Sequence, residues 1–230
     1  MTKTALLASA AGLALSVGSA SAASHVALTN KGSNHFARHV VHSTPRGLQT
    51  LVDQNESDTG IAILSQNFDS SQSVYDSTGA DDFSVPKGAT WIIKEVDVTG
   101  VYFNGSGPAT SENVIVYKDN KGLPGDIVAE ADNLKGDDNL GSFSIDLGKK
   151  SIKLGQGKYW LAVVANLGGI GNGGQWGWET NSVRNGRHPA AWQNQGGGFG
   201  VCQTWGVMQN CIGSYGEGPD FMFELKGRTK

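Results

Sequence analysis

Residues 143–165 read FSIDLGKKSIKLGQGKYWLAVVA, and the two ends of this stretch carry two different β-strand patterns. From Phe143 to Leu147, apolar and polar residues alternate, which is typical of a strand with one buried and one wet face. Residues 159–165 are continuously apolar, so we expect both faces of this strand to be covered, as in the centre of a packed sheet. The stretch therefore predicts a layered β protein.

The same kind of pattern recurs on both sides of this stretch. Short β-branched and aromatic runs lie between clusters of Gly, Asn, Asp and Pro, a spacing typical of a sandwich or barrel. No window of 11 or more residues holds a sustained helical period, so helix should be nearly absent. We predict about nine or ten strands in an antiparallel, jelly-roll-like β-sandwich with long Gly/Trp-rich loops. Further predicted strands are 61–64, 91–98, 101–103, 114–117, 127–129 and 221–225.

Composition and charge narrow the choice of partners. The chain has 230 residues, 33 glycines and only 17% charged residues, which argues against coiled coils and charged disordered tails. Its formal net charge is -3, so it lacks the basic surface that releases counterions from a nucleic acid backbone. We expect no nucleic acid partner.

The N-terminus has the pattern of a secretory signal peptide. Lys3 precedes a mostly apolar run over residues 5–17, and small residues at 20–22 suit signal peptidase. That run is shorter than the roughly 20 residues that cross a bilayer, and no second span follows. We therefore expect residues 1–22 to be removed, the mature chain to be secreted without a transmembrane anchor, residues 23–60 to form a poorly ordered polar leader, and residues 61–230 to form the domain.

Two groups of residues offer metal donors, each with an alternative reading. His35, His39 and His42 would share one face of a helix, although turn-forming residues bracket them and solvated histidines need no ligand. The acidic stretches 81–82, 119–120 and 137–139 could supply oxygen to a structural calcium ion, but none matches a spaced calcium loop. Because Asp and Asn also form turns by bonding their own backbone, we predict no metal site and no cofactor.

The two cysteines predict a disulfide. Cys202 and Cys211 are nine positions apart, and in an oxidising compartment two such thiols are expected to pair. Their spacing is not that of a Cys-x-x-Cys redox motif.

A change of composition between residues 166 and 219 marks the candidate ligand-binding region. This stretch holds 15 glycines and four of the six tryptophans, and Gly-rich loops commonly carry function. Trp176 and Trp178 are two apart, so on a strand they share a face and could form a flat platform for sugar rings. The alternative is that these indoles fill the core. The predicted ligand-binding residues are Trp176, Trp178, Trp192, Trp205, Gln175, Glu179 and Asn181.

Several short phrases resemble a β-sandwich module of bacterial secreted proteins. They are residues 66–69, 79–86, 91–105, 122–125 and 218–225, and the resemblance covers about residues 61–227. Modules of this kind are found alone or attached to extracellular proteases and surface proteins. The resemblance implies an accessory domain and no catalytic residues.

Three functions remain open from the sequence. The first is a secreted, non-catalytic module that binds an extracellular polysaccharide or cell-surface glycan. The second is a glycoside hydrolase on the same scaffold, which needs two carboxyls across a cleft, and Glu95, Glu179 and Glu224 lie on or near predicted strands. The third is a structural matrix or surface protein that associates with itself. No nucleophile signature of a hydrolytic triad is present in the sequence.

Overall fold

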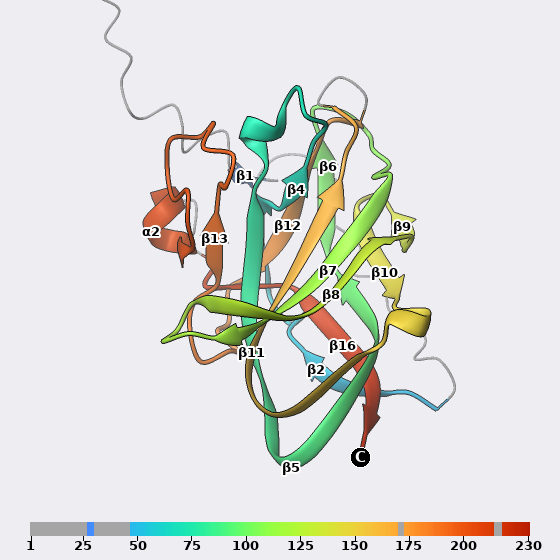
Figure 1. Ribbon diagram of the computed structural model, residues 1–230. Helices are drawn as coiled ribbons and strands as arrows, with labels where there is room; N and C mark the ends of the chain where they lie inside the picture. Colours follow the sequence, from blue (N-terminus) through green and yellow to red (C-terminus); the bar gives the residue numbers. More distant parts are fainter. Residues whose placement is uncertain (1–26, 30–46, 170–172, 214–217) are drawn as a thin grey trace, which may run out of the picture.

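The computed structural model describes residues 27–29, 47–169, 173–213 and 218–230. Two mostly antiparallel sheets pack face to face as a β-sandwich (Figure 1), which confirms the predicted fold class. The smaller sheet contains β1 (Ala27–Thr29), β3 (Asp58–Leu64), β6 (Gly100–Phe103), β12 (Gln175–Asn181) and β15 (Asp220–Phe221).

The larger sheet supplies most of the strands. Its members are β2 (Gln49–Asp53), β4 (Gln66–Asn67), β5 (Thr78–Val98), β7 (Ser111–Asp119), β8 (Pro124–Leu134), β9 (Asp137–Asn139), β10 (Ser142–Asp146), β11 (Ile152–Asn166), β13 (Ala191–Gln193), β14 (Gly206–Val207) and β16 (Phe223–Thr229). The helices whose bounds are described are short: α2 (Met208–Ile212), η2 (Ser73–Tyr75) and η3 (Gly148–Lys150).

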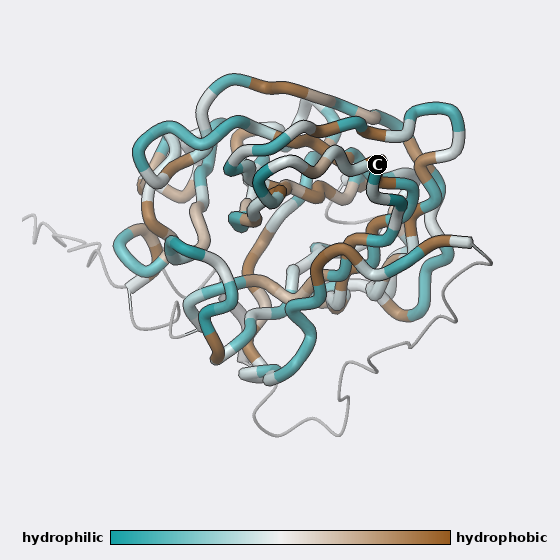
Figure 2. The backbone as a smooth tube through the Cα atoms, turned by 90° about the horizontal axis from the view of Figure 1, so that it is seen from below, coloured by the Kyte–Doolittle hydropathy of each residue, from teal (hydrophilic) through white to brown (hydrophobic). Residues whose placement is uncertain are grey.

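The apolar run at residues 159–165 is a central strand, as predicted. It lies in β11, which pairs with β5 on one edge and with β7 on the other. Apolar side chains of both sheets meet between the layers, including Ile63 and Trp178 from the smaller sheet and Ile93 and Leu161 from the larger one. Figure 2 shows hydrophobic and hydrophilic stretches following one another along the backbone.

The long strand β5 shapes the surface of the larger sheet. It bends near Gly88, whose positive φ of 79° suits a glycine, and Figure 1 shows it as a V. The first arm pairs with β13, and the second arm pairs with β16, while β11 follows both arms along the other edge. The bend therefore separates β13 from β16 on the same edge of β5.

Part of the predicted leader belongs to the sandwich. β2 pairs with β16, β1 pairs with β3, and β3 itself begins at Asp58. The predicted boundary at residue 61 is therefore too late. A strand of five residues such as β2 is too short for its period to be recognised in the sequence. Its partner β16 is about 170 residues away in the chain, so their pairing leaves no local signal.

The Gly/Trp-rich segment differs in part from the prediction. Trp176 and Trp178 lie in the strand β12, as their sharing of a strand face requires, whereas Trp192 lies in the strand β13 and not in a loop. No helix among the described residues is long and apolar enough to cross a membrane. The predicted signal peptide and the three leader histidines lie outside the described residues.

Candidate functional site

The predicted aromatic platform faces the interior. Trp176 and Trp178 are stacked with ring centroids 6.5 Å apart, so the predicted spacing is confirmed, but both side chains are completely buried. Trp176 stacks on Phe143, and Trp178 stacks on Phe221 at 4.5 Å. The prediction that these rings are displayed to a ligand is wrong, because β12 turns this face toward the opposite sheet.

Each buried indole also has its N–H satisfied by a carbonyl. Trp176 Nε1 donates to Gly141 O at 2.7 Å, and Trp178 Nε1 donates to Met222 O at 2.7 Å. The two bonds remove the cost of burying the only polar atom of each ring. Gly100 packs beneath Trp176, where a Cβ would lie 2.6 Å from Nε1. The indoles are therefore built into the core.

The other two candidate tryptophans are in different environments. Trp192 is fully buried, and its Nε1 donates to Leu64 O at 2.8 Å, so it too is a core residue. Trp205 is half-buried and packs edge-on against Tyr117, with 5.5 Å between ring centroids. Of the four predicted platform residues, only Trp205 reaches the surface.

The polar candidates of β12 are buried as well. Gln175 accepts a hydrogen bond from Asn104 Nδ2 at 2.6 Å, and Glu179 is completely buried. Asn181 Nδ2 donates to Gln54 O at 2.8 Å, while Asn181 Oδ1 accepts from Val183 N. Asn181 holds neighbouring backbone, and all three side chains are buried and are not displayed for hydrogen bonds to a ligand. The interpretation of Glu179 as an exposed catalytic carboxyl is therefore wrong.

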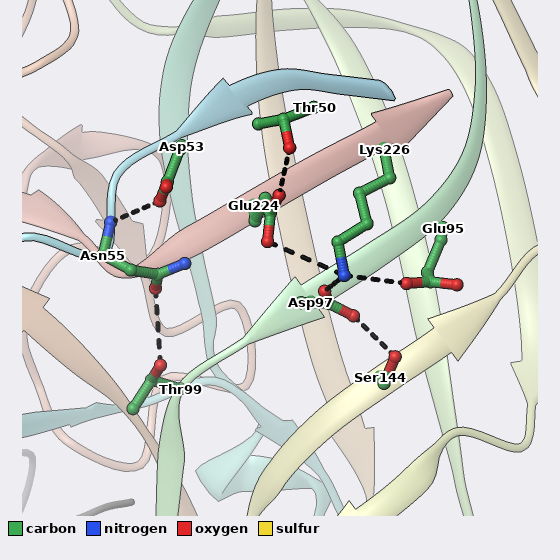
Figure 3. Close-up of polar contacts among 9 residues, drawn as sticks. All are labelled: Thr50, Asp53, Asn55, Glu95, Asp97, Thr99, Ser144, Glu224 and Lys226. Atoms are coloured by element: carbon green, nitrogen blue, oxygen red, sulfur yellow. Dashed lines mark hydrogen bonds and ion pairs between the residues drawn. The ribbon is translucent and has the colours of Figure 1, made fainter. Parts of the chain in front are cut away.

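Two of the predicted carboxyls, Glu95 and Glu224, meet around one lysine on the outer face of the larger sheet (Figure 3). Lys226 Nζ lies 3.0 Å from Glu95 Oε1 and 3.7 Å from Glu224 Oε2, and it donates to Asp97 Oδ2. Strands β5 and β16 are paired here, with Lys226 opposite Glu95 and Glu224 opposite Asp97. We call these four residues the Lys226 cluster.

The ammonium of Lys226 stays charged within the Lys226 cluster. Only 1% of the Lys226 side chain is exposed, and burial by itself would favour the neutral amine. The hydrogen bonds and charges of Asp97 and Glu95 outweigh this effect and raise the pKa of Lys226. The ammonium therefore keeps its proton at neutral pH, which makes it a charge partner and unsuitable as a nucleophile.

In two of the acidic stretches considered for calcium, a carboxylate accepts a backbone hydrogen bond from its own turn. Asp119 Oδ1 accepts from Gly122 N and from Trp160 Nε1, and Asp138 accepts from Gly141 N and from the hydroxyl of Tyr102. No group of three or more His, Cys, Asp or Glu within the described ranges is arranged to hold a metal ion.

Cys202 and Cys211 are joined in a disulfide, as predicted, with their Cα atoms 5.7 Å apart. The bond ties α2 to the segment that precedes β14.

A hollow of about 420 Å³ lies beside the bend of β5, and it is the candidate binding site. We call it the β2/β5 cleft, because residues 51–54 of β2 and its end, residues 82–91 of β5 and residues 185–187 line it. Its apolar lining residues are Leu51, Val52, Phe83, Pro86 and Trp91, and its polar lining residues include Asp53, Gln54, Asp82, Ser84, Asn185 and Arg187. Its volume lies in the range of small-molecule sites.

Gln54 lines the cleft and has a buried acceptor without a partner. Its backbone N–H donates to Phe223 O at 2.8 Å, and its backbone carbonyl accepts from Asn181 Nδ2. The residue is 1% exposed, and its Oε1 has no hydrogen-bond partner among the described residues. A buried oxygen without a partner costs about 1–3 kcal/mol, which a donor from a bound molecule would recover.

The wall of the cleft opposite β2 is a loop held by two carboxylates. Asp82 Oδ2 and Oδ1 accept the backbone N–H groups of Arg187 and His188 at 3.0 and 2.9 Å. Asp220 Oδ2 accepts those of Asn185 and Gly186 at 2.6 and 3.1 Å. A Cβ at Gly186 would collide with Asp82, so the close approach needs glycine. Four consecutive amides therefore bind two aspartates.

Sequence reasoning missed this cleft. Asp82 was noticed only as a possible calcium donor, and Gln54 and Arg187 carry no motif. Their positions are joined only by the bend of β5 and by the pairing of β2 with β16. No spacing along the chain could have indicated that these residues meet.

No protein-family model matches the chain, and comparisons with curated proteins and with solved structures also find no match.

Proposed function

We propose that the chain is a secreted, non-catalytic module that binds an extracellular glycan in the β2/β5 cleft. The observation that carries this proposal is the hollow of about 420 Å³, which is lined by Gln54, a residue whose buried Oε1 has no hydrogen-bond partner among the described residues. A sugar hydroxyl is a suitable donor for this oxygen. Secretion rests on the signal-like N-terminus, and an accessory role agrees with the resemblance to modules of bacterial extracellular proteins.

The chemistry of the cleft supports a sugar as ligand. Leu51, Val52 and Pro86, which are partly or fully exposed, provide apolar surface for the C–H face of a ring, while Asp53, Asn185 and Arg187 provide acceptors and donors for hydroxyls. Phe83 and Trp91 stack nearly parallel, at 3° between ring planes, and are almost completely buried. Apolar surface combined with a few fixed polar groups is typical of small-ligand sites.

Calorimetry and affinity electrophoresis against neutral, acidic and amino polysaccharides test the proposal. We expect Gln54→Leu to weaken binding about tenfold, the effect of losing one hydrogen bond of roughly 1.4 kcal/mol. The same substitution should leave the free energy of unfolding unchanged or raised, because it removes an unpaired buried oxygen. This combination separates a ligand contact from a structural role.

Two exposed arginines provide a matched pair. Arg187→Ala should weaken binding because Arg187 lines the cleft, whereas Arg228→Ala removes the same charge from an exposed position on β16 outside the lining. Binding by the wild type to none of the polymers, or identical affinity in wild type and Gln54→Leu, would contradict the proposal.

Reducing-sugar release on the same polymers tests the hydrolase alternative. That alternative needed exposed carboxyls across a cleft, but Glu179 is completely buried, and Glu95 and Glu224 contact Lys226. Of the two carboxyls in the cleft, Asp82 uses both oxygens to hold the loop. The geometry therefore favours binding without catalysis.

A further inference from the structure

The loop wall of the β2/β5 cleft rests on three buried aspartates from two strands. Asp81 and Asp82 come from β5, Asp220 comes from β15, and each is at most 2% exposed. Asp81 accepts the backbone N–H of Phe221 at 2.6 Å, directly beside Asp220, and also that of Asp82 at 2.8 Å. Asp82 and Asp220 then accept all four amides of residues 185–188. We call the three residues the aspartate cluster.

One carboxyl oxygen of the aspartate cluster is free to carry a proton. Asp220 Oδ1 is buried and has no hydrogen-bond partner among the described residues, while Oδ2 of the same carboxyl accepts two amides. A proton on Oδ1 would leave both loop contacts of Oδ2 in place. The cluster can therefore become less charged without giving up the loop.

The groups around the aspartate cluster only partly compensate its negative charge. Asp220 faces Asp82 from β5 and Arg184 from the loop, and Asp81 faces Asp220 and Asp82. Burial raises the pKa of Asp220, and burial together with the charge of Asp220 raises the pKa of Asp81 well above its ordinary value. The backbone N–H groups act in the opposite direction at both carboxyls, but they do not cancel these effects.

We propose that residues 185–188 form a pH-responsive wall of the β2/β5 cleft, closed while the aspartate cluster holds a proton and loosened when the cluster is fully ionised. The importance of this wall for ligand binding rests on the function proposed above, but its movement does not. The loop is fastened to the rest of the protein through the very carboxylates that carry the charge.

The direction of the effect follows from linkage. A carboxyl whose pKa is raised by burial binds its proton more tightly with the loop closed than when it is open to water. Protonation therefore favours the closed loop, and rising pH above the ordinary carboxyl range favours opening. Glycan affinity should accordingly be highest in mild acid and fall as the pH rises.

Hydrogen exchange of the full chain without ligand tests the wall directly. Protection of the amides of residues 185–188 is measured from pH 4 to pH 9 and corrected for the pH dependence of exchange in the unfolded chain. We expect protection to fall with rising pH by about tenfold for each unit by which closure raises the pKa of the cluster. Asp220→Asn mimics the protonated carboxyl, so its loop should stay protected over the whole range.

Asp126→Asn is the matched control, because Asp126 is exposed on β8 and should leave the wild-type pH profile intact. Loop protection in the wild type that does not change with pH, or the same decline in Asp220→Asn, would overturn the proposal. If Asp220→Asn fails to fold, carboxyl ¹³C titration of the wild type replaces it. Loop amides that shift together with Asp81 and Asp220 support the wall, and loop amides that do not respond to this titration overturn it.

The two proposals fail in different ways. A pH-dependent loop in a protein that binds no polysaccharide would retain the wall and reject the glycan. Polysaccharide binding with equal affinity and equal loop protection from pH 4 to pH 9 would retain the glycan and reject the wall.

Discussion

Two pairs of large side chains, each two residues apart on one strand, differ in where they lie: one pair is in the interior of the sandwich, and the other is on an outer face. Trp176 and Trp178 on β12 point between the sheets, whereas Glu224 and Lys226 on β16 lie on the outer face of the larger sheet. Both pairs obey the alternation of a strand. What differs is the way in which each pair is accommodated away from water.

Burial of apolar surface stabilises the inner pair, Trp176 and Trp178, whereas the outer pair, Glu224 and Lys226, depends on oppositely charged neighbours. An indole gains free energy from burial itself and needs only one acceptor for its N–H, which Gly141 and Met222 supply. A buried ammonium loses hydration and is stable only among opposite charges, here Glu95, Asp97 and Glu224. Removing one member should therefore leave a cavity in the first case and uncompensated charge in the second.

The largest effect is expected at the inner pair. Trp178→Ala should lower the free energy of unfolding by about 3–5 kcal/mol, because it removes a fully buried ring that stacks on Phe221 and Trp176. Urea denaturation monitored by circular dichroism measures the loss. Trp205→Ala is the control, since that ring is half-buried and should cost clearly less. Equal losses in the two variants would show that the inner pair has no special role in stability.

The next effect tests the charged pair. Lys226→Met should cost about 3 kcal/mol, because it leaves Glu95 and Asp97 together without their ammonium. In the wild type, the raised pKa of Lys226 means that its contribution is fully present below about pH 10.5 and is lost as the pH rises through the higher folded-state value.

Thermal melts from pH 7 to pH 11 measure this contribution, with Lys94→Met as the control because the Lys94 side chain bonds only Ser151 among the described hydrogen bonds. A variant at Lys226 as stable as the wild type at pH 7 would count against the role assigned to the cluster.

A smaller effect is expected at Glu112, a buried carboxyl that accepts Gly136 N at 2.7 Å. Burial raises its pKa to about 6, with Asp138 contributing in the same direction. The folded state therefore holds this proton more tightly, so stability should fall by about 1–2 kcal/mol as the pH rises from 4.5 to 7. Glu112→Gln should flatten that part of the profile, and a wild-type slope that survives the substitution would assign it to another group.

The smallest effect is expected at the edge of the outer face. Thr50 donates to Glu224 Oε1 at 2.6 Å in an exposed contact, so Thr50→Val should cost only about 0.5–1 kcal/mol. Chemical denaturation of this variant and of Thr90→Val, which makes the same substitution on strand β5, distinguishes the hydrogen bond from the β-propensity of valine. A loss of several kcal/mol would mean that Glu224 depends on Thr50 more strongly than the exposed geometry indicates.

Local patterns were sufficient for the class of fold. The alternation around Phe143 and the apolar run at 159–165 predicted strands that the structure contains, because the two-residue period is a property of the backbone. The spacing of Cys202 and Cys211 predicted their disulfide, and the spacing of Trp176 and Trp178 predicted that they share one face of a strand, where their rings stack. Each of these depends on a short stretch of chain or on the chemistry of one residue type.

Tertiary structure alone decided which way the strands face and what meets across them. The two-residue period places two side chains on one face, but it does not say whether that face meets the opposite sheet or solvent, so the sequence left open whether the indoles bind a ligand or fill the core. The Lys226 cluster, the β2/β5 cleft and the aspartate cluster join residues up to about 170 positions apart through strand pairing and the bend of β5. Such contacts depend on register between distant strands, which no local pattern encodes.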